Sequence, residues 1–168
     1  FVHPDKMNFS VVHEALRRLK VNHRSTEWKI MGPMDPKGNP HHQNLLNELN
    51  DSWVEFTGRI TDLKEVLFHQ RLAEMTAMLL PFRNKTGSNG TAPSRSSLQI
   101  AWAFGLPVVA SSPMEDEPDL RHEENCLLVD EDDPSAWQVA VERIVNDRTL
   151  RETLREGSLA SARLFGWY

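Results

Sequence analysis

The feature that most constrains the fold is a regular alternation of short apolar segments with longer amphipathic ones. Residues 76–82, TAMLLPF, form a continuous apolar run about as long as one strand, and residues 107–111, PVVAS, form another. An uninterrupted apolar run of this length predicts a strand that is buried on both faces, as in a parallel sheet covered by helices. The segments between such strands should then be crossover helices.

Helices are expected where apolar residues recur at three- and four-residue spacing. Residues 9–20 place Phe9, Val12, Leu16 and Leu19 on one side of such a helix. Asp133 followed by Pro134 predicts another helix start, and Thr149 with Glu152 matches a capping box. Further helices are expected over residues 41–50, from Thr61 onward and over 95–104, and further strands over 27–32, 52–58 and 126–129.

This order of elements predicts the fold class and the domain organisation. Strand and helix alternate five or six times, which favours an α/β fold with a doubly wound parallel sheet, Rossmann-like, with right-handed crossovers. No fixed-period repeat or low-complexity tract divides residues 1–168, so one domain is expected. Ligands bind such sheets at the carboxyl ends of the strands. The loops after Gly32, Gly58 and Pro81 therefore define the expected site.

Composition and motifs argue against several function classes. The net charge is −5 without a clustered basic stripe, which disfavours nucleic-acid binding. No apolar run approaches the ~18 residues of a membrane span, and no signal peptide is evident. The single cysteine, Cys126, precludes an internal disulfide and favours a reducing, cytoplasmic location. Neither a Walker A motif nor G-x-G-x-x-G is present.

Other conspicuous side chains have unremarkable interpretations. The adjacent His41 and His42 would not share one face of a helix, and no zinc-type spacing accompanies them, so no metal site is expected. Cys126 is interpreted as an inert small hydrophobe. The aromatic residues expected in the core are Trp28, Trp53, Trp102, Phe104 and Trp137.

The junction from Gly87 to Ser97 could carry chemistry. A glycine-bearing loop there leads into a helix start, whose free backbone N–H groups attract anions. Arg95, Ser96 and Ser97 add side-chain donors, and an arginine can bind phosphate with two hydrogen bonds. A capped helix with a solvated Arg95 is an equally good interpretation of these residues alone.

Four stretches then occur in a characteristic order: FTGRIT, IAWAFGLPVVA, HEENCLLVDEDDPSAW and, at the end, ARLFGW with Trp167. Together they resemble the C-terminal, donor-binding domain of GT-B glycosyltransferases, glycosyltransferase family 4 (group 1) in particular, over nearly the whole chain. The resemblance implies a bacterial-type enzyme that takes its hexose from a UDP- or GDP-linked donor. It implies no separate cofactor and no metal.

The resemblance also implies donor-binding positions. Lys6 matches a lysine that helps hold the donor diphosphate, although the arginine that usually precedes it would fall on Phe1. Gly58, Arg59 and Ile60 match the backbone that meets the base. The diphosphate would lie at the helix start, against Arg95, Ser96 and Ser97. The remaining donor-binding candidates are Gly90, Thr91 and Ile100.

The chain departs from the family at two carboxylates. The family's glutamate pair would occupy Ala92, where it binds the sugar, and Ile100, where it binds the ribose hydroxyls. The stretch SRSSL resembles a helix start that some bacterial members use instead of that pair. Glu115 or Glu117 is a minor candidate near the sheet edge. No catalytic base can be assigned from the sequence.

The leading hypothesis is therefore a donor-binding domain that is part of a longer two-domain glycosyltransferase. It would transfer a hexose, with retention of configuration, to an acceptor sugar or lipid-linked glycan held by an N-terminal domain. By itself the domain is expected to bind donor without turnover. Peripheral membrane association of the full-length protein is compatible with this. The alternatives are a decayed, non-catalytic interaction module and a GT-B nucleotide-sugar epimerase.

Overall fold

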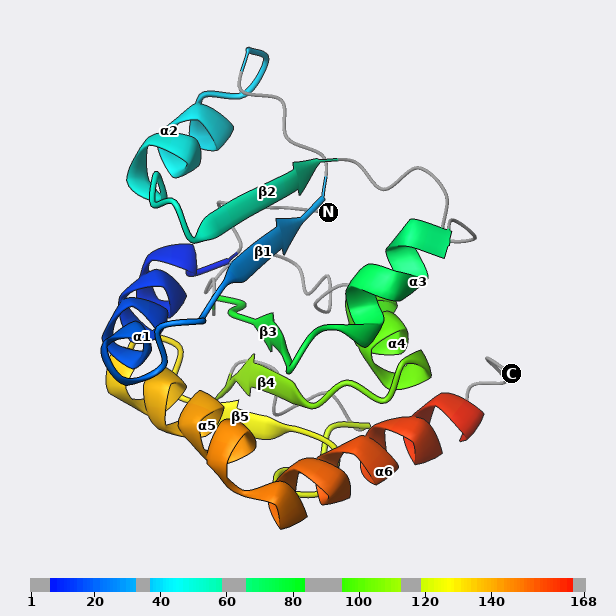
Figure 1. Cartoon of the computed structure of the whole chain (residues 1–168). Helices are drawn as coiled ribbons and strands as arrows, with labels where there is room; N and C mark the ends of the chain where they lie inside the picture. Colours follow the sequence, from blue (N-terminus) through cyan, green and yellow to red (C-terminus); the bar gives the residue numbers. More distant parts are fainter. Residues whose placement is uncertain (1–6, 33–36, 59–65, 84–94, 113–118, 165–168) are drawn as a thin grey trace.

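The computed structural model describes residues 7–32, 37–58, 66–83, 95–112 and 119–164. Helices and strands alternate over most of these residues (Figure 1). The elements are, in chain order, α1 (Phe9–Asn22), β1 (Trp28–Met31), α2 (Pro40–Glu48), β2 (Val54–Gly58), α3 (Val66–Ala73), β3 (Met78–Leu80), α4 (Arg95–Ala103), β4 (Val108–Ser111), β5 (Leu127–Val129), α5 (Pro134–Asn146) and α6 (Arg148–Leu164).

All three pairs of neighbouring strands are parallel, which confirms the predicted doubly wound α/β class. Strand β1 pairs with β2, and β3, β4 and β5 pair in that order. Figure 1 shows the strands stacked as β2, β1, β3, β4, β5, with α1 and α5 on one face and α3 and α4 on the other. The described strands form two hydrogen-bonded sheets, because β1 and β3 lie next to each other in this order without pairing.

Strand β4 is the centre of the larger sheet. Its four residues are 0% exposed, as the apolar run PVVAS predicts. Val109 belongs to the core cluster on the α1 and α5 face, whereas Val108 and Ala110 belong to the cluster on the α3 and α4 face. Successive side chains of a strand point to opposite faces. The central strand therefore contributes to both halves of the core.

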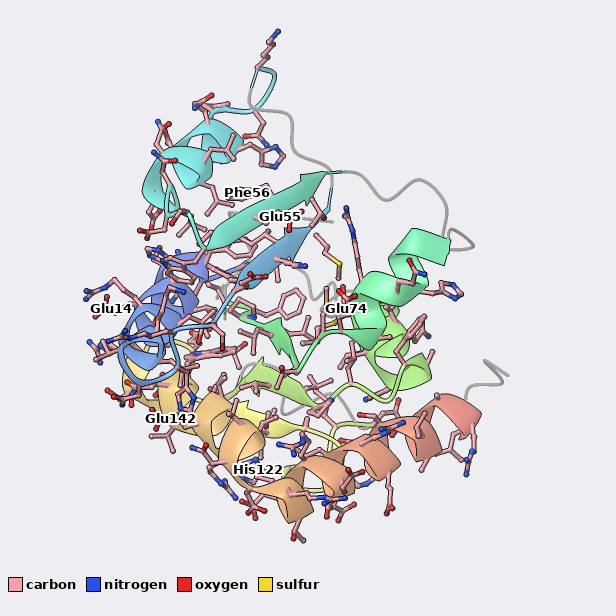
Figure 2. All side chains as sticks on the ribbon, in the orientation of Figure 1. Glu14, Glu55, Phe56, Glu74, His122 and Glu142 are labelled. Carbon is pink, nitrogen blue, oxygen red and sulfur yellow. The ribbon has the colours of Figure 1, made fainter. Side chains whose placement is uncertain are left out.

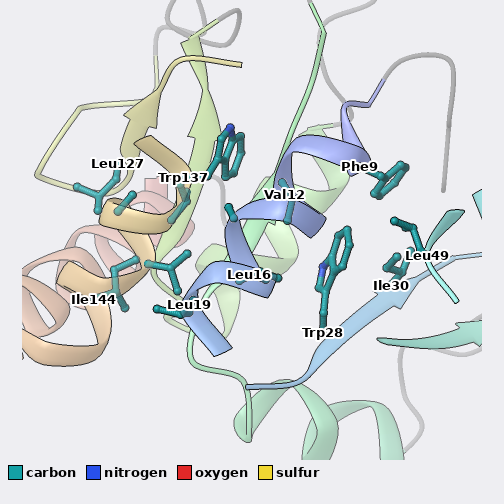
Figure 3. Close-up of a cluster of buried hydrophobic side chains, with 14 of the residues drawn as sticks. Phe9, Val12, Leu16, Leu19, Trp28, Ile30, Leu49, Leu127, Trp137 and Ile144 are labelled. Atoms are coloured by element: carbon teal, nitrogen blue, oxygen red, sulfur yellow. The ribbon is translucent and has the colours of Figure 1, made fainter. Parts of the chain in front are cut away.

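Helix α1 organises the first core cluster. The four residues predicted on its apolar side, Phe9, Val12, Leu16 and Leu19, are all buried. Figure 3 shows this helix between β1 on one side and α5 with β5 on the other. The cluster thus joins the β1–β2 pair to the larger sheet through side chains on α1.

The expected core aromatics divide into two groups. Trp28, Trp102 and Trp137 are buried, as predicted. Trp53 and Phe104 are only partly buried. Trp53 stacks on the His13 imidazole with 5.2 Å between ring centroids, and Lys20 Nζ lies 5.9 Å from its centroid. Cations and aromatic rings attract each other in this way at a surface, so Trp53 covers the edge of the core.

Helix α4 is ended by a glycine, Gly105, before the chain enters β4, as predicted. Gly105 adopts a φ of +61°, a left-handed conformation that glycine adopts without strain. The Gly105 N–H donates to Trp102 O at 3.0 Å, and the Leu106 N–H donates to Ala101 O at 2.8 Å. These bonds satisfy the last carbonyls of α4 and aim the chain into β4.

The prediction for the start of the last helix is wrong. Thr149 was expected to cap it with Glu152, but α6 begins at Arg148. Asp147 is the single residue between α5 and α6, and its carboxylate accepts a hydrogen bond from the Leu150 N–H at 3.0 Å. Because α5 continues to Asn146, Asp147 is the one residue there that can act as the cap. The predicted cap at Asp133 is confirmed, since its carboxylate accepts from the Ser135 N–H at 2.8 Å.

Helix α6 crosses the β5 side of the sheet and touches both clusters. Leu150 and Leu154 pack into the first cluster, and Ala162 packs into the second. The buried Asn125 side chain holds the turn before β5 against this helix: it donates to Ser161 Oγ at 2.9 Å and accepts from the Arg121 N–H at 2.8 Å. The asparagine of the NCLLV stretch thus has a structural role.

Gly157 allows this close approach. A Cβ atom added there would lie 2.1 Å from Glu124 O, a backbone atom. We expect Gly157→Ala to lower the free energy of unfolding by about 1–3 kcal/mol, as overpacking does. Glycine to alanine inside an exposed helix instead stabilises by about 1 kcal/mol. Urea unfolding followed by circular dichroism measures the change.

The matched control is the exposed neighbour Glu156→Ala, which should change stability by less than about 0.5 kcal/mol. A stability gain in Gly157→Ala would show that α6 and the turn at Glu124 are not packed this closely.

Candidate functional site at the carboxyl edge of the sheet

The first part of the expected site is the end of the β1–β2 pair. Met31 lies opposite Gly58, after a shift of register that follows Ile30. Gly32 then has a φ of +147°, a conformation that side chains disfavour. The chain therefore leaves the sheet at the two glycines, Gly32 and Gly58, after which the sequence predicts ligand-binding loops.

Asn8 connects three segments at the same edge. The Asn8 N–H donates to Pro81 O at 2.6 Å, immediately beyond β3. Its side chain is buried; it donates to Asp132 Oδ1 at 2.8 Å and to Glu131 O at 3.1 Å, both beyond β5. Its Oδ1 accepts from the Arg83 guanidinium at 3.0 Å. The start of α1 is thereby fixed against the ends of β3 and β5.

Ser111 adds a second connection at this edge. Its buried hydroxyl donates to Phe82 O at 2.6 Å, so the last residue of β4 holds the segment beyond β3. Met7 forms an antiparallel bridge with Phe82 on the other side of that segment. As a result, Arg83 places its charge at the carboxyl edge, where ligands of doubly wound sheets bind.

The start of α4 presents polar residues and then a buried face. Arg95 is its first residue, Ser96 is exposed and Ser97 is partly buried. From Leu98 onward the helix is buried at the positions that face β3 and β4. Ile100 is partly buried and packs against the second core cluster, which contains Leu98. The branched side chain of Ile100 thus packs against the core at a position where the family resemblance implies a carboxylate.

Several predicted site residues lie outside the described part of the chain. These are Lys6, Arg59, Ile60, Gly90 and Thr91, together with Ala92, Glu115 and Glu117. Their roles, and that of the Arg95 side chain, stay predictions. Among the candidates that are described, the structure places Gly58 at a strand end and Ser96 and Ser97 in the first turn of α4.

The sequence reasoning missed the polar connection through Asn8, Arg83 and Asp132. An asparagine directly before a helix signals an N-cap, and Asn8 occupies that position, but its side chain makes no capping hydrogen bond. It reaches instead to residues 75 and 124 positions away in the sequence. No local pattern specifies such distant partners.

Two of the interpretations of isolated residues can be compared with the structure. Cys126 is buried, and desolvation raises the pKa of its thiol to about 12, which confirms an unreactive side chain. In the described ranges, no three His, Cys, Asp or Glu side chains come together as a metal site would require. The helices described there include none that is long and apolar enough to cross a membrane.

These features define a class: an α/β domain with a parallel doubly wound sheet and a polar site at its carboxyl edge. The family model for group 1 glycosyl transferases matches residues 1–147, and the chain belongs to that family. A D-inositol 3-phosphate glycosyltransferase of Nocardioides sp. (strain ATCC BAA-499 / JS614) is 40% identical over 67 residues. That match covers 40% of this chain and 15% of the relative.

Solved structures show the same fold. HepE of Anabaena, in complex with UDP-glucose, superposes with a TM-score of 0.74 at 16% identity, over 97% of this chain and 42% of HepE. The C-terminal domain of the group 1 protein LpcC of Francisella tularensis superposes with a TM-score of 0.70 at 13% identity, over 95% of this chain and 80% of that domain. The chain thus spans about two fifths of HepE and most of the LpcC domain, which confirms the predicted resemblance to a C-terminal GT-B domain.

The role of Asn8 can be tested by removing its side chain. We expect Asn8→Ala to lower the free energy of unfolding by about 1–3 kcal/mol, because the buried Asn8 side chain and its partly buried hydrogen bonds to Asp132 Oδ1 and Glu131 O are lost. Thermal and urea unfolding measure this loss. Asn50→Ala, at an exposed position, is the control and should be near neutral. Equal stability of the two variants would contradict a structural role for Asn8.

Proposed function

We propose that this chain is the donor-binding domain of a glycosyltransferase that uses a nucleotide-diphosphate sugar. The observation that carries the proposal is the match to the group 1 family over residues 1–147, together with a polar carboxyl edge on the corresponding fold. The structures of HepE with UDP and with UDP-glucose show that a related fold holds such a donor. Their presence among the structural neighbours favours a UDP-linked sugar over a GDP-linked one.

The proposed donor position follows the sheet edge. The base contacts the backbone from Gly58 to Ile60, at the end of β2, and the diphosphate lies at the start of α4, near Ser96 and Ser97. Free N–H groups at a helix start and positioned cations stabilise an anionic diphosphate. Arg95 and Lys6 supply the cations in this proposal, and Gly90 and Thr91 are further donor-binding residues.

The same positive charges also stabilise the reacting state. As the glycosidic bond to the donor breaks, negative charge accumulates on the leaving diphosphate, and positioned cations and dipoles lower the energy of that state. The hexose passes, with retention of configuration in this proposal, to an acceptor sugar or lipid-linked glycan bound by an N-terminal domain. Binding without turnover is therefore the activity expected of these 168 residues.

A non-catalytic module is the second candidate, and one observation favours it. Ile100, at the position of the family's ribose-binding glutamate, contributes to the second core cluster. A lost hydrogen bond to a charged group costs about 1.5–3 kcal/mol of binding. If no other contact replaces it, donor affinity falls by a factor of roughly ten to 150.

Donor binding distinguishes the two candidates. We expect calorimetric titration to show saturable binding of UDP and a UDP-hexose, and weaker binding of GDP and ADP. Lys6→Ala and Arg95→Ala should each raise the dissociation constant about 10- to 150-fold, since each removes a charge-assisted contact to phosphate. Arg24→Ala removes an exposed cation from the turn that leads into β1, at the opposite edge of the sheet, and should leave the constant unchanged. Absence of binding at millimolar ligand would favour the non-catalytic module.

Ile100→Glu tests the carboxylate directly. Because Ile100 is partly buried against the second cluster, the substitution should lower the melting temperature. If position 100 faces the ribose, it should also tighten UDP binding several-fold at neutral pH, where the introduced side chain is an ionised carboxylate. Ile100→Gln is the control for size and polarity. A loss of stability with unchanged affinity in both variants would show that Ile100 has only a core role.

A further inference from the structure

Arg83 is an exposed cation directly beyond β3, at the carboxyl edge of the larger sheet. The backbone that leads to it is held from two sides. The Asn8 N–H, which precedes α1, donates to Pro81 O at 2.6 Å. The Ser111 hydroxyl, at the end of β4, donates to Phe82 O at 2.6 Å. The packing of α1 and β4 therefore fixes the point from which the Arg83 side chain extends.

A chain of hydrogen bonds orients the Arg83 side chain. The Asn8 side chain is buried, and its Nδ2 donates to Asp132 Oδ1 at 2.8 Å and to Glu131 O at 3.1 Å. Both hydrogens of this amide group are thereby used, which leaves the amide oxygen as the acceptor for Arg83 Nη2, at 3.0 Å. Because each member of the chain fixes the next, the guanidinium is held in one orientation at the edge.

The positive charge of Arg83 has no ion-pair partner in the described part of the chain. Asn8, a neutral amide, bonds to both Arg83 and Asp132, so the guanidinium and the carboxylate are linked without forming an ion pair. The ion pairs of the described residues join other side chains. The bond to Asn8 leaves further guanidinium N–H groups that can donate to a ligand.

Several other arginines of the described ranges use their charge inside the protein. Arg17 and Arg18 each donate to the Glu14 carboxylate on α1 at 2.8 Å (Figure 2). The bond from Arg17, with that from Arg18, lowers the pKa of Glu14 to about 2. Arg143 likewise donates to Glu123 at 2.6 Å. An arginine that is bonded instead to an amide, at the edge where doubly wound sheets bind ligands, keeps its charge for an anion.

Arg83 and the proposed donor position lie at the same end of β3. Helix α4 leads from β3 to the parallel strand β4, and a crossover helix begins at the carboxyl end of the strand that it follows. The start of α4, with Ser96 and Ser97, is where the diphosphate lies in the proposed function. Arg83 therefore extends from the same edge as the group that is most negatively charged in the donor.

We propose that Arg83 is a further donor-binding residue and that its guanidinium binds an oxyanion of the nucleotide sugar. The diphosphate presents such oxygens, and so does the carboxylate of a hexuronic acid if that is the transferred sugar. Arginine binds either group through two parallel hydrogen bonds. This inference rests on the proposed function, and it adds to that function a contact from the segment beyond β3.

The test is calorimetric titration of the wild-type chain and of Arg83→Gln with UDP, UDP-glucose and UDP-glucuronate. If the diphosphate is the bound group, the dissociation constants of all three ligands should rise by about tenfold or more in the variant. If the sugar carboxylate is the bound group, only that of UDP-glucuronate should rise. Arg83→Lys keeps the charge without the paired donors, so its affinity should lie between the two. Arg24→Ala, at the opposite edge, is the matched control.

Equal dissociation constants for the wild type, Arg83→Gln and Arg24→Ala with all three ligands would overturn this inference and leave the proposed function standing. Failure of the wild type to bind any of the ligands would overturn both. Because Arg83 is exposed, Arg83→Gln should melt close to the wild type in circular dichroism. If it does not fold, Arg83→Lys decides: a several-fold loss of affinity supports the inference, and wild-type affinity overturns it.

Discussion

The burial of β4 on both faces is the constraint on which the rest of the structure depends. Val109 anchors the cluster that contains α1 and α5, and Val108 with Ala110 anchors the one that contains α4. Removing apolar surface from water on both sides supplies the main driving force for this layered arrangement. Because β4 is central and parallel to both neighbours, it also brings the carboxyl ends of β3, β4 and β5 to one edge.

That edge is where long-range polar contacts build the candidate site. Asn8 joins the start of α1 to the segments after β3 and β5, and Ser111 joins β4 to Phe82. These bonds are partly buried, so a donor that lost its partner would incur part of its desolvation cost. The position of Arg83 at the edge is thus a consequence of the same packing that stabilises the sheet.

Local sequence signals predicted local structure well. The helical spacing from Phe9 to Leu19, the proline start after Asp133 and the glycine after α4 all correspond to observed elements. Thr149 is not the cap because α5 continues to Asn146 and α6 begins at Arg148. Asp147, the single residue between the two helices, is therefore the cap. The interruption between β1 and β3 and the contacts of Asn8 could not be predicted, since both depend on which segments become neighbours in space.

The sequence by itself determined the class of fold, the order of its elements and the family, because hydrophobic periodicity and ordered motifs are properties of neighbouring residues. The tertiary structure alone decided that Ile100 packs against the core, that Gly157 lies against the backbone oxygen of Glu124 and that Asn8 and Arg83 form a hydrogen bond. The physical reason is one of range. Hydrophobic periodicity relates residues a few positions apart, whereas close packing and long-range hydrogen bonds join residues separated by up to 124 positions along the chain.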